Sequence, residues 1–156
     1  MPSLFLAELA RAVVVLHAIA AMVLVGAATH HAIVAVGYLR GSYRVRLARV
    51  YAATVAVAWL VTFALGLVAY PTFRYAVRAL VLDRDAPWAT SLFDLKEHLA
   101  AVGVPLALGV FALSRVLDPK SDRAIARVYV AMTILAAAIL WFDTISGLVI
   151  TMVKAV

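Results

Sequence analysis

The stretch from Ala12 to Leu39, AVVVLHAIAAMVLVGAATHHAIVAVGYL, contains no Asp, Glu, Lys or Arg. This uncharged run is longer than the roughly 20 apolar residues that a helix needs to cross the hydrocarbon core of a bilayer. It therefore predicts a transmembrane helix. The stretch also holds three of the chain's four histidines, which are His17, His30 and His31.

Two of these histidines share one face of the predicted helix. His17 and His31 are fourteen residues apart, which places them within about 40° of one another around the helix and roughly 21 Å apart along its axis. His30 falls on another face. The shared face carries mostly small residues: Ala20, Ala21, Leu24, Ala27, Ala28 and Ala35. Since polar residues at membrane depth usually face the interior of a bundle, we expect this face to meet the other helices.

The composition extends this prediction to the whole chain. Of the 156 residues, 67% are hydrophobic, and the mean hydropathy is +1.05, well above the values typical of soluble domains. The sequence predicts an all-α integral membrane protein, a single four-helix transmembrane bundle in contact with the lipid bilayer. The expected helices cover residues 12–39, 50–73, 93–115 and 127–153. The absence of cysteine excludes disulfides, thiolate metal sites and covalently attached c-type haem.

Charged residues gather between the predicted helices. Pro71 is expected to end or kink the second helix, followed by the longest loop of the chain. The loops after the first and third helices hold eight of the fourteen Lys and Arg residues. This bias predicts cytoplasmic short loops and non-cytoplasmic termini, as in a bacterial inner-membrane protein. The net charge of +6 is interpreted as topology signal and lipid-headgroup contact, and no nucleic-acid partner is expected.

Counting helical rise from the expected helix ends places several polar residues at one depth. His17, His98 and Asp143 fall near the end of the bundle that carries the termini. The residues expected beside them are Tyr70, Arg74, Lys96 and Glu97. Polar residues gathered at one end of a membrane bundle indicate either a functional site or a cluster of mutually paired side chains.

A haem b site is the leading interpretation of this group. Neutral imidazoles are strong iron ligands, and facing helices of a four-helix bundle commonly hold such a cofactor. His17 and His98 would be the two axial ligands. Arg74 and Arg78 would contact the haem propionates, and Asp143 would orient a ligand histidine or carry protons.

Simpler interpretations of the same residues stay open. Histidines paired with Asp143 or Glu97 would form a purely structural polar cluster. Asp143 could equally form a salt bridge to Lys96 or Arg74. Lys96 and Glu97 could form an ion pair at headgroup level, or could help to anchor propionates.

His30 and His31 fall near the opposite end, where Met132 and Thr133 are the expected partners. Two bis-histidine haems would need four histidines on two helices, and only His98 lies outside the first helix. A possible second site at His30 and His31 would therefore need a non-histidine ligand or a partner chain. The alternative is that these two are interfacial or hydrogen-bonded histidines.

The first helix resembles that of two families of small helical membrane proteins. Leu16-His17, followed by Ala20 and Gly26, is similar to the first helix of the copper-resistance-D-like and the membrane protoporphyrinogen-oxidase-like families. Lys96, near the start of a later helix, resembles a lysine of the second family. The resemblance implies haem contact at His17 and a role for Lys96.

Three functions are compatible with these observations. The first is an electron-transfer subunit that binds haem b, possesses a cytochrome b-like site, and exchanges electrons with a quinone or with other subunits of a larger membrane redox complex. The second is a non-catalytic accessory subunit that docks to other membrane subunits or forms a homo-oligomer. The third is a proton or ion pathway. The pattern favours an electron-transfer or accessory subunit over a stand-alone enzyme.

Overall fold

The computed structural model describes residues 9–154, and this part of the chain is built from seven helical segments without a strand. In chain order these are α1 (Ala10–Val36), η2 (Gly37–Arg40), α2 (Val45–Phe73), η3 (Arg74–Leu82), α3 (Asp83–Asp85), α4 (Pro87–Val116) and α5 (Arg123–Val153). Four of these helices, α1, α2, α4 and α5, are long enough to form the body of the molecule. The predicted all-α four-helix architecture is confirmed.

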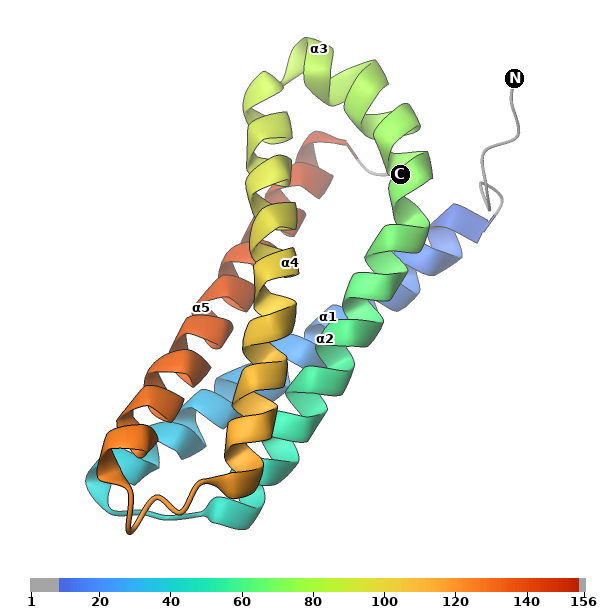
Figure 1. Ribbon diagram of the computed structural model, residues 1–156. Helices are drawn as coiled ribbons and strands as arrows, with labels where there is room; N and C mark the ends of the chain where they lie inside the picture. Colours follow the sequence, from blue (N-terminus) through green and yellow to red (C-terminus); the bar gives the residue numbers. More distant parts are fainter. Residues whose placement is uncertain (1–8, 155–156) are drawn as a thin grey trace.

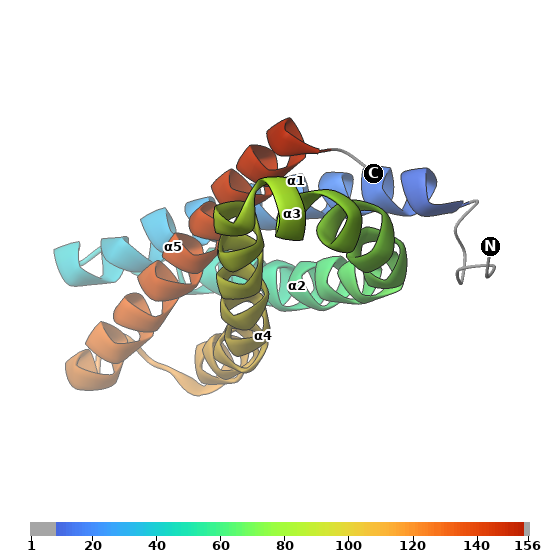
Figure 2. The same cartoon turned by 90° about the horizontal axis from the view of Figure 1, so that it is seen from above.

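The four long helices pack as two crossed pairs. α1 lies beside α2, α4 lies beside α5, and the pairs meet through α1 with α5 and α2 with α4 (Figure 2). η2 and the α4–α5 connection lie at one end of the bundle, which we call the loop end. The start of α1, the α3 segment and the end of α5 lie at the other end (Figure 1), which we call the terminal end. This is the up-and-down arrangement of four successive spans.

Each long helix is sufficiently long and apolar to cross a bilayer. The four apolar segments are Ala10–Arg40, Val45–Asp85, Pro87–Val116 and Arg123–Val153. Their outward faces carry large exposed apolar side chains, including Met22, Val57, Val102 and Leu148. Apolar surface on this scale is not stable against water, so these faces indicate contact with lipid.

The face of α1 that was expected to meet the other helices is buried from Leu24 onwards and partly buried at Ala20 and Ala21. Leu24, Ala27, Ala28, His31 and Ala35 are all buried residues of α1. His30, which was placed on another face, is exposed. The small side chains allow the backbone of α1 to approach its neighbours closely, which is the usual basis of helix packing in membranes.

At the centre of the bundle, the side chain of Trp59 packs against Gly103. Trp59 of α2 is only 2% exposed, and its Nε1 donates a hydrogen bond of 3.2 Å to the carbonyl oxygen of Ala100 in α4. A Cβ atom on Gly103 would lie 1.8 Å from Cζ2 of Trp59. The close approach of α2 and α4 at this level therefore requires glycine at position 103.

The segment after α2 differs from the expected loop, because it is helical. Pro71 lies inside α2, and the chain continues as the wider helix η3 and the short α3 before α4 begins at Pro87. Val77 and Leu82 of this segment are fully buried, in a cluster with Phe93. Burial of these apolar residues outweighs the backbone hydrogen bond that Pro71 cannot donate. Figure 1 shows the segment bending over the terminal end towards α4.

The third span also starts earlier than residue 93. Proline is favoured in the first turn of a helix, where its missing N–H has no intrahelical partner, and α4 begins with Pro87. Lys96, Glu97 and His98 consequently lie inside a continuous helix and not at its entrance. Because successive residues of a helix point about 100° apart, these three side chains diverge to different faces of α4.

Candidate functional site

A cavity of about 440 Å³ lies between the four long helices towards the terminal end. It is partly open and mostly apolar, with contributions from α1, α2, α4 and α5. The polar residues that line it include His17, Thr62, Lys96, Glu97 and Asp143. The expectation that His17, Asp143, Lys96 and Glu97 share one end of the bundle is thus met, because one cavity contains all four.

His17 is oriented by a backbone carbonyl of the neighbouring helix. Its Nδ1 lies 2.9 Å from the carbonyl oxygen of Thr62 in α2. A carbonyl can only accept a hydrogen bond, so Nδ1 carries the proton and donates it. In the neutral imidazole, the other ring nitrogen, Nε2, is then unprotonated, and no hydrogen bond to it is formed within residues 9–154. Histidine ligands of metals are commonly fixed in this way, with one nitrogen donating to a carbonyl and the other free to bind.

Gly66 allows the imidazole to reach that carbonyl. It lies one turn after Thr62 on α2, and a Cβ atom there would lie 3.4 Å from Cε1 and 3.6 Å from Nδ1 of His17. Both distances are ordinary van der Waals contacts, so alanine would also fit, whereas a longer side chain would compete with the ring for space. The hydrogen bond between α1 and α2 is therefore compatible with a small residue at position 66.

Two buried oxygen atoms in the cavity wall have no hydrogen-bond partner among the described residues. These are Oδ1 of Asp143 and Oγ1 of Thr62, each on a side chain that is 9% exposed. A buried polar atom without a partner costs free energy, and such atoms are rare in folded proteins. Their presence on the wall of a cavity favours an occupant, either water or a ligand with polar groups.

Lys96 brings a positive charge to the same cavity. Its Nζ lies 5.8 Å from the ring centroid of Phe93, and its Cε lies 3.6 Å from the position that a Cβ on Gly147 would take. Within the described range, it forms no ion pair with Asp143 or with Glu97, so the salt bridges considered from the sequence are not made. An ammonium and a carboxylate that face one cavity without touching leave both groups available to an occupant.

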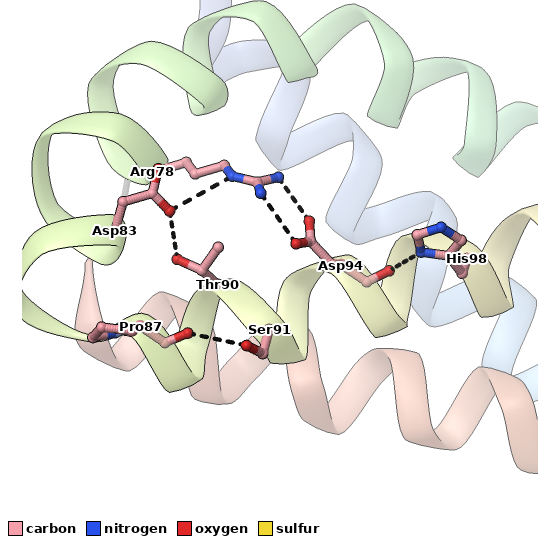
Figure 3. A network of polar contacts seen from close by, with 7 residues as sticks. All are labelled: Arg78, Asp83, Pro87, Thr90, Ser91, Asp94 and His98. Carbon is pink, nitrogen blue, oxygen red and sulfur yellow. Dashed lines mark hydrogen bonds and ion pairs between the residues drawn. The ribbon is translucent and has the colours of Figure 1, made fainter.

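His98 does not face this cavity. It is exposed on α4, and its Nδ1 donates a hydrogen bond of 2.6 Å to the carbonyl oxygen of Asp94 in the same helix. Figure 3 shows His98 at one end of a polar network that runs along the outside of α4. The structure therefore does not bring His17 and His98 together as a facing pair of ligands.

Arg78 belongs to the same outer network. Its Nη1 and Nη2 donate to the two carboxylate oxygens of Asp94 at 2.7 and 3.0 Å, and its Nε lies 3.7 Å from Asp83 (Figure 3). The Asp83 carboxylate also accepts a hydrogen bond from Thr90. This network joins η3 and α3 to α4, so the guanidinium of Arg78 has a structural role and does not line the cavity.

Two further residues predicted beside the site lie outside the cavity wall. Arg74 is exposed, and Tyr70 is stacked on Phe93, with ring centroids 6.3 Å apart. Phe93 itself lines the cavity and also stacks on Phe73. Tyr70 thus supports an aromatic wall, while Arg74 has no contact with the site.

The remaining two histidines lie in the loop-end half of the bundle. His31 is 1% exposed, and its Nε2 is hydrogen-bonded to the hydroxyl of Tyr129 at 2.6 Å. His30 is exposed and donates from Nδ1 to the carbonyl oxygen of Gly26 at 2.8 Å, with its ring stacked on Tyr51. The structure pairs each with a neighbour, as in the hydrogen-bonded alternative, and does not join them in one site.

Sequence reasoning did not find three of the residues that shape these contacts. Thr62 acts through its backbone carbonyl, for which no sequence signal exists. Gly66 could have been noticed as the only glycine in the apolar middle of α2. Tyr129 could have been considered beside Met132 and Thr133, because it lies one helical turn before Thr133 on the same face.

Comparisons with protein-family models, with curated proteins and with solved structures find no match for this sequence. The resemblance of Leu16-His17 and Lys96 to the two membrane families therefore stays a prediction. What the structure adds is that His17 and Lys96, which are far apart in sequence and lie on different helices, line one cavity.

Proposed function

We propose that the protein binds haem b in this cavity, with Nε2 of His17 as an axial ligand, and acts as an electron-transfer subunit of a membrane redox complex. The observation that carries the proposal is the hydrogen bond from Nδ1 of His17 to the carbonyl oxygen of Thr62. It selects the tautomer in which Nε2 has a free lone pair, and it holds the ring of a cavity-lining residue in place.

The residues that line the cavity are suited to a ligand such as haem, which has a large apolar ring and acidic propionate substituents. Its volume of about 440 Å³ falls within the roughly 300–1,000 Å³ of typical ligand pockets. The aromatic residues of its wall include Trp59, Phe63, Phe73 and Phe93. The ammonium of Lys96 could bind a propionate, which is the role that the sequence suggested for Arg74 and Arg78.

The proposal needs one histidine of this chain and not two. His98 lies outside the cavity and donates to its own helix. A second axial ligand would have to be a small molecule or a residue of another subunit, as is expected for a protein that works within a complex. Removing His98 should therefore leave haem binding intact.

A quinone is the second candidate occupant, and Lys96 together with Asp143 favours it. A quinone carbonyl needs a hydrogen-bond donor, which the ammonium of Lys96 supplies, and a quinol hydroxyl needs an acceptor, which Oδ1 of Asp143 supplies. The cavity is partly open, as a lipid-soluble molecule requires. The same side chains would serve a quinone without any metal ligation by His17.

The arrangement gives less support to a proton pathway across the whole bundle. The polar residues of the cavity and the His31–Tyr129 pair are separated by the buried side chains of Leu24, Trp59 and Leu140. Apolar side chains in close contact do not conduct protons. Asp143 is therefore better interpreted as part of a binding site at one end.

The test is an absorption spectrum of the detergent-purified protein from haem-sufficient cells. We expect a sharp α-band in the reduced-minus-oxidised spectrum and about one haem per chain by the pyridine haemochrome assay. A folded, colourless protein that takes up no added haem would refute haem binding. In that case, quenching of Trp fluorescence by a short-chain quinone, weakened by Lys96→Met, would support the second candidate.

A further inference from the structure

A second, smaller pocket of about 170 Å³ lies at the loop end, far from the cavity that contains His17. It is formed between the turn after α1 and the first turns of α5. The residues that matter for its chemistry are Tyr38, Gly41, Tyr43, Arg123 and Arg127. Gly41 adopts a φ of +79° there, which favours glycine and turns the chain back towards α2. The pocket is the right size for a small polar group and too small for a whole lipid or cofactor.

Its two arginines have no acidic partner within residues 9–154. Arg123 and Arg127 are one helical turn apart on α5, so their side chains project to the same side. The nearest acidic residues in the chain are used otherwise: Oδ1 of Asp118 accepts from the backbone N–H of Lys120, and Oδ1 of Asp122 accepts from that of Ile125. The pocket therefore contains two guanidinium groups that form no salt bridge with a described residue, although the two aspartates reduce the charge around them.

The position of these arginines in the helix adds to the excess of positive charge. The first turn of a helix carries a partial positive charge and favours acidic side chains. α5 has no acidic residue in its first turn and begins with Arg123, while the carboxylate of its N-cap residue Asp122 accepts from the N–H of Ile125. This carboxylate offsets only part of the positive charge of the helix start and its two arginines. A bound anion would offset more of it.

A tyrosine of the pocket provides an independent observation. Tyr38 lines the pocket and is only 6% exposed. Its ring is held by stacking on Tyr129 and by contact with Tyr43. Its hydroxyl forms no hydrogen bond to any residue that the structure describes. The ring is fixed by its neighbours, and the hydroxyl is left available to a group that binds in the pocket.

From these observations, we propose that the loop-end pocket binds a phosphate group through Arg123, Arg127 and the hydroxyl of Tyr38. Guanidinium groups bind phosphate with paired hydrogen bonds, which two adjacent arginines can supply. The phosphate could belong to the headgroup of an anionic phospholipid or be a free inorganic ion. Basic pockets beside transmembrane helices are well suited to lipid headgroups.

The experiment is native mass spectrometry of the purified full-length protein with phosphatidylglycerol or phosphatidylcholine added, together with thermal unfolding in inorganic phosphate. The pocket variant is Arg123→Gln with Arg127→Gln. The matched control is Arg46→Gln with Arg115→Gln, which removes the same charge from exposed positions at the same end, outside the pocket. Tyr38→Phe tests the hydroxyl alone.

We expect the wild-type protein and the control to retain phosphatidylglycerol in preference to phosphatidylcholine, and the pocket variant to bind it about tenfold more weakly, since charge-assisted hydrogen bonds are lost. Tyr38→Phe should show a smaller loss. Without lipid, the pocket variant should unfold at the same temperature as the wild type or higher, because it carries less positive charge at the start of α5. This outcome separates lost binding from misfolding.

Two results would identify the source of the phosphate. Displacement of the lipid by inorganic phosphate would support a headgroup site, and thermal stabilisation by phosphate without retention of lipid would support a soluble ion. Equal retention of both lipids, with no effect of phosphate, would overturn the proposal. An equal loss in the pocket variant and the control would also overturn it, since the effect would then follow from total charge alone.

Discussion

The imidazole of His17 donates from Nδ1 to the backbone carbonyl oxygen of Thr62, across a distance of 2.9 Å. The hydrogen bond joins α1 to α2 and fixes the tautomer of a histidine that lines the cavity between the four long helices. Because the acceptor belongs to the backbone, it does not depend on the side chain at position 62. The orientation of His17 follows from the packing of two helices and from Gly66, which leaves room for the ring.

Filling the cavity should remove its occupant without unfolding the bundle. Gly147 lines the cavity, and a side chain there would extend towards Lys96. We expect Gly147→Leu to lower haem occupancy by about tenfold or more, which corresponds to about 1.4 kcal/mol of binding free energy. The matched control is Gly26→Leu, at a position with no atom near the new Cβ. The measurement is the haem content per chain of the two purified variants. Equal content in both would contradict the proposal that haem binds in this cavity.

Gly103→Ala should destabilise the protein strongly. The new Cβ would lie 1.8 Å from Cζ2 of Trp59, a clash that only separation of α2 and α4 could relieve. Overpacking of this kind costs about 3 kcal/mol or more in a tight core. Thermal unfolding in detergent should show a marked fall in Tm, whereas Gly26→Ala should cause no fall, because alanine is the better helix former. A Gly103→Ala variant as stable as the wild type would refute the close packing of these two helices.

Tyr129→Phe should destabilise the loop-end half of the bundle. The substitution leaves Nε2 of His31 buried without its partner at 2.6 Å, at a cost of about 1–3 kcal/mol in the free energy of unfolding. Tyr51→Phe serves as the control, since the hydroxyl of Tyr51 has no partner among the described residues while its ring packs on His30. Denaturant titration of both variants would reveal the difference. Similar stabilities would show that the His31–Tyr129 hydrogen bond contributes little.

Arg78→Gln should loosen the junction between η3 and α4. The variant loses the paired hydrogen bonds to Asp94, but the two side chains are 25% and 41% exposed, so the expected cost is only about 1 kcal/mol. Arg74→Gln, which removes the same charge from an exposed residue nearby, should have no such effect. The Tm of the wild type should fall more than that of Arg78→Gln as salt is added, because salt screens the ion pair. An equal dependence of Tm on salt in the two proteins would contradict a stabilising ion pair between Arg78 and Asp94.

The sequence predicted the fold well because membrane spans leave strong signals. The uncharged stretch from Ala12 to Leu39 and the other apolar stretches were sufficient to predict four helices, and helical periodicity placed His31 and His30 on different faces. The segment after Pro71 was predicted as a loop because its charged residues resemble one. The segment is helical, and it buries Val77 and Leu82 in a cluster that includes Phe93 of α4 and Ile150 of α5, a contact between helices that no local pattern reveals.

The depth of the candidate site residues along their helices was predictable from the sequence. The direction in which their side chains point was not. Counting residues from helix ends placed His17, Lys96, Glu97 and Asp143 at one end, and they line one cavity. The rotation of α4 about its axis was not predictable, since it depends on how Trp59 packs against Gly103. That rotation turns Lys96 towards the cavity and His98 away from it.

The most direct test of the account compares reduced-minus-oxidised absorption spectra of His17→Ala and His98→Ala with that of the wild type, at equal amounts of folded protein. Both variants remove one imidazole, yet only His17 lines the cavity. The account predicts that His17→Ala loses the haem α-band and that His98→Ala keeps it with about the same haem content per chain. Loss of the band in His98→Ala, or its retention in His17→Ala, would contradict the account.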